Sequence, residues 1–99
     1  MAARRKGLID IEVMAQAAEC LKTLAHPCRL RMIEMLLNDD YTVGELADAC
    51  DIPSHMASEH LGRMRDRGLL SCERKGREVY YSVKRDGLKH IIECVRRHF

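Results

Sequence analysis

The hydrophobic period of the chain changes twice along its length, and this pattern constrains the fold more than any other feature. Up to Gly68, apolar residues recur at every third or fourth position, as they do on one face of a helix. Residues 69–74 and 78–83 have the character of short strands, and apolar and polar positions alternate in the second. From residue 86 to residue 99 the helical period returns. The order of four helices, a hairpin and a last helix predicts a mainly α domain with a small β-hairpin.

Capping residues predict where the helices begin and end. Pro27 favours the first turn of a second helix, since its ring presets a helical φ and its missing N–H is not needed there. Thr42 and Glu45 have the spacing of a capping box at the start of a short third helix. A fourth helix is predicted over residues 54–67, and Gly68 is a suitable residue to end it. These signals leave only a tight turn between the third and fourth helices.

Length and composition fit one small globular domain. The chain has 99 residues, of which 46% are hydrophobic and 32% charged, a balance that excludes wholesale disorder. Residues 1–9 are predicted to be a flexible N-terminal arm, and residues 10–99 a single domain. No segment approaches the ~18 apolar residues of a membrane span, and the isolated cysteines suit a reducing compartment. We therefore expect a cytoplasmic protein with no membrane partner.

Apolar stripes on the first and last helices predict self-association. The first stripe consists of Met14, Ala17, Ala18, Leu21, Leu24 and Ala25, and the second of Leu88, Ile91, Ile92, Val95 and Phe99. A chain this short buries only a modest core, so these faces offer more apolar surface than one copy uses. A homodimer would cover the remainder.

The short third helix, the turn and the longer fourth helix form a helix-turn-helix arrangement, and the basic hairpin that follows makes it a winged helix. The fourth helix would present its first residues to base edges in the major groove of double-stranded DNA. The predicted base-edge contacts are Ser54, His55, Met56, Ser58, Glu59 and His60. The predicted backbone contacts are Arg63 and Arg65 on this helix and Lys75 and Arg77 at the hairpin tip. The helical period leaves open whether Met56 or Ala57 faces inward.

The formal net charge of +2 hides an acidic middle region and a basic C-terminal region. Residues 26–62 carry two basic and seven acidic side chains, whereas residues 63–99 carry eleven basic and five acidic ones. A basic C-terminal third indicates an anionic partner. Glu59 adds a negative charge near the major groove of the DNA. Its carboxylate would either accept a hydrogen bond from a cytosine amino group or form an ion pair with Arg63.

The sequence also bears on two other classes of function. A winged helix can serve as a protein-interaction module without direct operator binding, and the low net charge and Glu59 favour that alternative. An enzyme is not expected, because the chain has no Gly-rich phosphate loop, H-E-x-x-H motif or nucleophile elbow.

Five segments resemble motifs of the ArsR/SmtB family of winged-helix repressors, in the right order and at the right spacing. They are residues 24–31 (LAHPCRLR), 43–47 (VGELA), 57–61 (ASEHL), 68–70 (GLL) and 74–81 (RKGREVYY). The resemblance extends over about residues 18–85. It implies a cytoplasmic prokaryotic repressor that dimerises through its first and last helices and binds an imperfect inverted repeat.

The resemblance also implies that a metal ion or a thiol-reactive signal releases the DNA. One metal site of the family uses a C-x-C motif, but its positions here are Thr42 and Gly44, which offer no thiolate. A second family site lies on the last helix, where this chain has Asp86, His90, Cys94 and His98 at four-residue spacing. Only adjacent members of this row share a face, so a dimer mate would complete a site for zinc, cobalt or nickel. No cofactor is required on this interpretation, and the metal ion would act as an effector.

A thiol switch is the other option for an effector. Cys20 and Cys94 could approach each other if the first and last helices pack together. Cys28 follows Pro27 in the first turn of its helix and has two arginines close in sequence, an environment typical of reactive thiols. Five inert cysteines are an equally acceptable interpretation, since most free cysteines are small buried hydrophobes.

Overall fold

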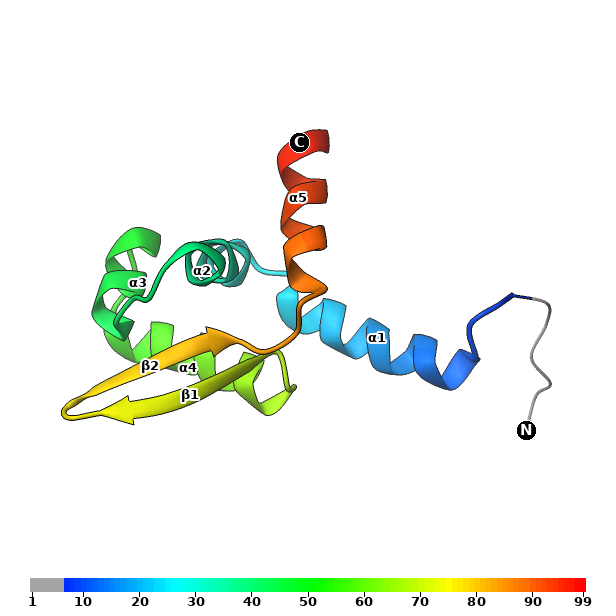
Figure 1. Ribbon diagram of the computed structural model, residues 1–99. Coiled ribbons are helices and arrows are strands. Elements are labelled where there is room, and N and C mark those ends of the chain that lie inside the picture. The colour runs from blue at the N-terminus through cyan, green and yellow to red at the C-terminus, as the bar shows by residue number, and fades with distance from the viewer. Residues whose placement is uncertain (1–6) are drawn as a thin grey trace.

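The computed structural model describes residues 7–99, and it contains the predicted elements in the predicted order (Figure 1). They are α1 (Ile11–Leu24), α2 (Pro27–Asn38), α3 (Val43–Cys50), α4 (Ser54–Asp66), β1 (Leu70–Lys75), β2 (Glu78–Val83) and α5 (Leu88–His98). The winged helix-turn-helix prediction is therefore confirmed. Residues 1–6 of the predicted arm lie outside the described residues, and residues 7–9 precede α1 without helical structure.

The capping box at the start of α3 is confirmed. The Thr42 hydroxyl accepts from the Glu45 N–H at 3.1 Å, and the Glu45 carboxylate accepts from the Thr42 N–H at 2.8 Å. Thr42 also forms an isolated antiparallel bridge with Tyr80 of β2, which the sequence did not reveal. This bridge attaches the start of the helix-turn-helix to the hairpin.

A backbone turn in the left-handed region separates α3 from α4. Asp51 ends α3 with a φ of +55°, and the N–H of the next residue, Ile52, returns to the carbonyl of Ala47 at 3.1 Å. Aspartate is one of the few residues other than glycine that adopts this conformation readily. Three residues, 51–53, separate the two helices, and α4 starts at Ser54 as predicted.

Gly68 ends α4 in a Schellman motif. Its φ is +76°, its N–H donates to the carbonyl of Arg65, and the N–H of Leu69 donates to the carbonyl of Met64, both at 2.9 Å. Leu69 therefore serves the helix end, which explains why β1 begins one residue later than predicted. The last helix likewise begins at Leu88 rather than at Asp86.

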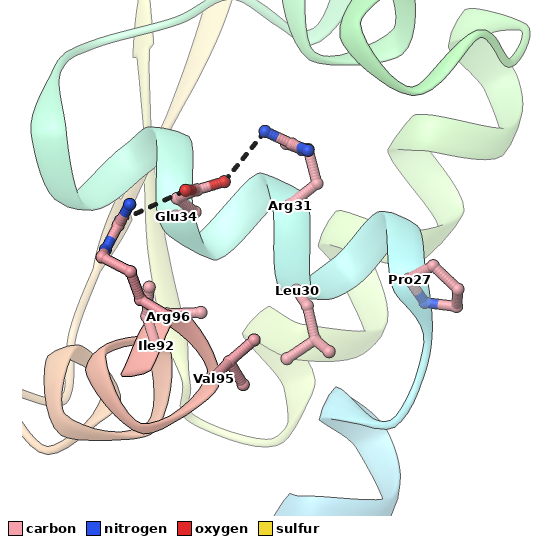
Figure 2. Close-up of a pocket in the computed structure, with 7 residues that line it drawn as sticks. All are labelled: Pro27, Leu30, Arg31, Glu34, Ile92, Val95 and Arg96. Carbon is pink, nitrogen blue, oxygen red and sulfur yellow. Dashed lines mark hydrogen bonds and ion pairs between the residues drawn. The ribbon is translucent and has the colours of Figure 1, made fainter. Parts of the chain in front are cut away.

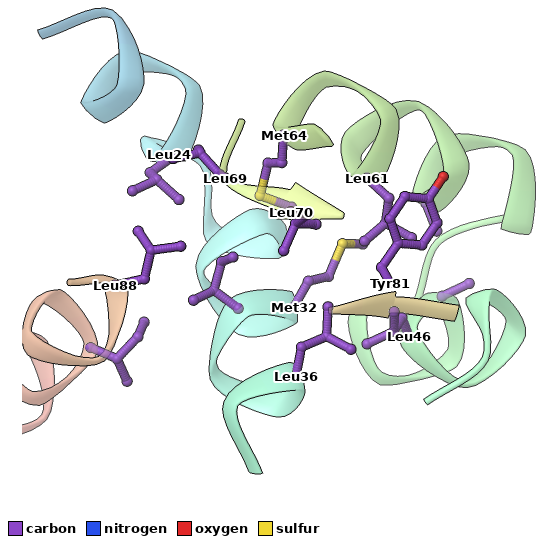
Figure 3. Packing of buried hydrophobic residues seen from close by; sticks show 14 residues of the cluster. Leu24, Met32, Leu36, Leu46, Leu61, Met64, Leu69, Leu70, Tyr81 and Leu88 are labelled. Atoms are coloured by element: carbon purple, nitrogen blue, oxygen red, sulfur yellow. The ribbon is translucent and has the colours of Figure 1, made fainter. Parts of the chain in front are cut away.

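The core lies between α2, α3, α4 and the hairpin (Figure 3). Ala57 faces inward and is fully buried, whereas Met56 is 40% exposed, which settles the choice left open by the helical period. Met32 is also fully buried, although the sequence did not single it out. The buried set is Leu24, Met32, Ile33, Leu36, Leu46, Ala47, Ala57, Leu61, Met64, Leu69, Leu70, Tyr81, Leu88 and Ile92.

The terminal helices contribute little to this core and project away from it (Figure 1). In α1 only Leu24 is buried, while Met14 and Leu21 remain about half exposed. In α5 the apolar face continues outward to Val95 and to Phe99, which is 96% exposed. The radius of gyration is 15.3 Å, larger than the ~13 Å of a compact domain of this length. One copy of the chain therefore leaves most of the α1 stripe and the end of the α5 stripe uncovered.

Glu34 of α2 connects α5 to the rest of the domain (Figure 2). Its carboxylate lies 3.2 Å from the guanidinium of Arg96 on α5 and 3.0 Å from that of Arg31 one turn back on α2. A groove of about 250 Å³ runs between the two helices, lined on its apolar side by Leu30 and Ile92 among others. None of the described helices is both long and apolar enough to span a bilayer.

Candidate nucleic-acid interface

The first turns of α4 expose a polar surface. Ser54, His55, Met56, Ser58 and Glu59 are all exposed, and none of them belongs to the core. No side chain caps this end of α4, so its first N–H groups remain available to a ligand. Hydroxyl, imidazole and carboxylate groups at this position are able to donate to or accept from base edges.

The arginines of α4 differ in how they are held. Arg65 forms an ion pair with Asp66 at 3.2 Å and reaches the Cys72 sulfur of β1 at 4.0 Å, which joins α4 to the hairpin. Arg67, just beyond the helix, pairs with Glu19 of α1 at 3.1 Å. Arg63 is exposed and has no ion pair within residues 7–99. Glu59 has none there either, so the predicted Glu59–Arg63 pair is absent from this part of the chain.

The tip of the hairpin carries two exposed basic side chains. Lys75 and Glu78 are paired across the strands, so Gly76 and Arg77 form a two-residue loop. Gly76 has a φ of +64°, which the first central position of such a hairpin turn requires. The Lys75 ammonium lies 5.6 Å from the centre of the Tyr80 ring, a cation–π distance. The tip is thus positively charged and held by a tight turn.

His60 is less exposed than the other predicted base-edge residues. It is half-buried, and its Nδ1 accepts a hydrogen bond from Arg29 Nε at 2.9 Å. Its ring centre lies 4.4 Å from that of His26. Arg29 also donates to the Thr23 carbonyl at 2.8 Å, so this one guanidinium joins α1, α2 and α4. The contact of His60 with a base edge stays a prediction, and in this structure the ring contacts Arg29 and His26.

Burial and neighbouring groups shift the pKa of two side chains in this region. Burial lowers the pKa of His60, and His26 and Arg29 lower it further. Burial also raises the pKa of the Cys50 thiol, with a further contribution from Cys28, whose carbonyl lies 3.7 Å from the Cys50 sulfur. Both shifts in pKa favour the uncharged form of the group.

Three metal-type donors meet at the same place. The ligand atoms of His26, Cys28 and His60 lie within 4.8 Å of one another, and all three residues are half-buried. His26 is the N-cap of α2, and its Nδ1 accepts from the Cys28 N–H at 3.1 Å. Sequence spacing did not reveal this group, because His60 belongs to a different helix from the other two.

The residues predicted to bind a metal effector or to form a thiol switch lie farther apart than this group of three donors. Asp86 precedes α5 instead of lying on it, and Asp86, His90, Cys94 and His98 are all exposed. Within residues 7–99 of a single chain they do not form a group of three close donors. Cys20 lines a groove with Leu88 on α5, whereas Cys94 is exposed and is not part of that groove's lining.

Comparison with known proteins agrees with this architecture. Residues 24–73 match the family model described as "Helix-turn-helix domain". The Escherichia coli K12 regulator YgaV is 37% identical over 82% of this chain and 83% of its own length. The SmtB repressor of Mycobacterium tuberculosis H37Rv is 36% identical over 82% of this chain, which spans 60% of SmtB. The structure of reduced HlyU from Vibrio cholerae superimposes with a TM-score of 0.81 at 29% identity, covering 90% of this chain and 94% of HlyU.

The fold, the exposed start of α4 and the basic hairpin define a winged-helix DNA-binding regulator. Together with these similarities, they show that the chain belongs to the ArsR/SmtB-type helix-turn-helix transcriptional regulators. The relatives are named as transcription regulators rather than enzymes.

Proposed function

We propose that this regulator is a homodimeric, cytoplasmic repressor that binds an imperfect inverted repeat in double-stranded DNA. The observation that carries the proposal is the exposed polar start of α4, joined through Arg65 and Cys72 to a basic hairpin. In this arrangement α4 enters the major groove while the hairpin tip lies along the backbone. A dimer presents two copies of α4, which matches the two halves of an inverted repeat.

The proposed base-edge contacts are Ser54, His55, Met56, Ser58 and Glu59, and all five are exposed. The Met56 side chain would contact apolar groups such as a thymine methyl. Arg63, Arg65, Lys75 and Arg77 would contact phosphates. His60 is left out of the contact set and is instead a positioning residue, because Arg29 ties it to α1 and α2.

The uncovered stripes of the terminal helices support the dimer. Met14 and Leu21 of α1 are seven residues apart and share one helix face, and both are about half exposed. Val95 and Phe99 extend the apolar face of α5. Apolar surface that one copy leaves in water is the surface that a second copy can bury.

We also propose that an effector of the metal or thiol-reactive class relieves repression. The half-buried His26, Cys28 and His60 group supports a metal effector, and it adds to the α5 row and to Cys20, Cys28 and Cys94 as candidate sensing residues. Zinc, cobalt and nickel are the ions that suit imidazole, carboxylate and thiolate ligands.

A gel shift with the promoter beside the protein's own gene tests the repressor. We expect a sequence-preferring complex at submicromolar protein that weakens as salt is raised. The quadruple substitution of Arg63, Arg65, Lys75 and Arg77 by alanine should abolish it. Persistence of the complex in that variant would contradict the proposed interface, and absence of any specific complex would favour an interaction module.

A further inference from the structure

The start of α2, with its N-cap His26, and the inner face of α4 bring two imidazoles and a thiol together. The donors of His26, Cys28 and His60 lie within 4.8 Å of one another. Within residues 7–99 this is the only group of three or more His, Cys, Asp or Glu donors that are close enough to share an ion. Two imidazoles and one thiolate form a ligand set that suits zinc and its spectroscopic substitute cobalt.

The hydrogen bonds of the two rings show which lone pairs an ion would take. Nδ1 of His60 accepts from Arg29, and Nδ1 of His26 accepts from the Cys28 N–H. A ring nitrogen that accepts carries no proton, so these hydrogen bonds assign the ring protons to Nε2. An ion bound at Nδ1 of His60 therefore needs no change of tautomer. It has to replace Arg29 there, because both use the same lone pair, and at Nδ1 of His26 it has to replace the Cys28 N–H in the same way.

We propose that His26, Cys28 and His60 form a binding site for a divalent zinc-class ion, whose occupancy displaces Arg29 from His60. The Cys28 thiol gives its proton to solvent and the sulfur binds the ion, so one proton is released for each ion bound. The two neutral imidazoles release none. A water molecule completes four-coordinate geometry. This site is separate from the row of Asp86, His90, Cys94 and His98, which comes from another part of the chain.

Occupancy of this site would act on the recognition helix directly. Arg29 is the residue that connects His60 on α4 to the Thr23 carbonyl at the end of α1. Once an ion holds His60, this connection is broken and α4 is held through the turn before α2 instead. The effect on operator binding rests on the proposed function, whereas the metal site itself does not.

Cobalt absorbance of the reduced full-length protein tests the site without DNA. We expect one Co²⁺ per chain, with a thiolate-to-cobalt charge-transfer band in the near ultraviolet and the visible bands of a tetrahedral ion. Cys28→Ser is nearly isosteric, and it should abolish the charge-transfer band. His60→Gln should weaken binding by about tenfold or more. Arg29→Met should tighten binding, because it removes the competitor for the His60 lone pair, and a merely structural arginine would not have this effect.

Matched controls keep the result interpretable. Cys50→Ser changes another half-buried cysteine that is not part of the donor group, so it should leave stoichiometry and bands as in the parent protein. His90→Ala tests whether the α5 row supplies the ligands instead. Far-ultraviolet circular dichroism checks that each variant is folded. A charge-transfer band that survives Cys28→Ser, or that disappears in His90→Ala, overturns the assignment. Absence of the band in the parent protein does the same. Absence of operator binding, with the cobalt bands intact, would contradict the proposed function alone.

Discussion

Arg29 Nε donates to His60 Nδ1 at 2.9 Å, while the same guanidinium donates to the Thr23 carbonyl at 2.8 Å. Three helices meet at this half-buried side chain. Arg29→Met keeps most of the apolar stem but leaves two acceptors without their donor, so we expect a loss of about 1–3 kcal/mol in the free energy of unfolding. Arg31→Met is the matched control, because Arg31 makes only an exposed ion pair and should cost under about 1 kcal/mol. Chemical denaturation in a chelating buffer measures both, and equal losses would contradict a special role for Arg29.

Replacing Gly68 by alanine should lower stability, whereas replacing Gly62 by alanine should raise it. Gly68→Ala forces a side chain into a left-handed conformation at φ +76°, with an expected cost of about 1–2 kcal/mol. Gly62 lies inside α4, and an added Cβ would meet nothing closer than the tip of Arg65 at 3.9 Å. Gly62→Ala should therefore raise stability by about 0.5–1 kcal/mol. Thermal unfolding of the two variants should give shifts of opposite sign, and shifts of the same sign would refute this account of the end of α4.

The capping box is testable through a double-mutant cycle. Thr42→Ala should lower the free energy of unfolding by about 1 kcal/mol, because the Glu45 N–H loses its acceptor. Glu45→Ala removes the reciprocal bond to the Thr42 N–H. Since the two residues form one motif, the double variant should lose less than the sum of the single losses. Strict additivity, measured by urea denaturation, would show that the two bonds act independently.

Arg63 should contribute more to DNA binding than Arg65. Arg63 has no ion pair in the described part of the chain, whereas Arg65 must leave Asp66 before it can contact a phosphate. Arg63→Ala should reduce the slope of log affinity against log salt by about 0.9, the value for one phosphate contact. Arg65→Ala should change the slope less. Fluorescence anisotropy with operator DNA over a salt series measures both slopes, and a larger change for Arg65→Ala would reverse the ranking.

A charge placed on the α1 stripe should prevent dimer formation. Leu21→Asp introduces a carboxylate on a face that a second copy would bury, and the cost of desolvating it would favour the monomer. Met56→Asp is the control, because Met56 is similarly exposed but lies at the start of α4, which we propose faces DNA and not a second copy. Sedimentation equilibrium should show a monomer only for Leu21→Asp. If both variants remain dimeric, the α1 stripe is not the interface.

Local sequence features predicted the elements of this protein well. Thr42 and Glu45 define the start of α3 and Gly68 the end of α4, because capping depends on residues within one turn of each other. The hairpin and its basic tip were predictable for the same reason, but the predicted turn included Lys75, which the structure pairs with Glu78 as the end of β1. The predicted starts of β1 and α5 were each too early. Leu69 completes the end of α4, so β1 begins at Leu70, and residues 86–87 form a turn, so α5 begins at Leu88.

The sequence by itself determined the order of the elements and the winged-helix class, since hydrophobic period and capping are local properties. Only the tertiary structure decided which side chains of α4 face solvent and which face the protein. His60 lies four residues after Met56 in the same helix, yet it faces inward because Arg29 and His26 from other helices hold it there. The same packing brings Cys28 beside two imidazoles. Contacts between residues far apart in sequence depend on how helices pack, and no single helix contains that information.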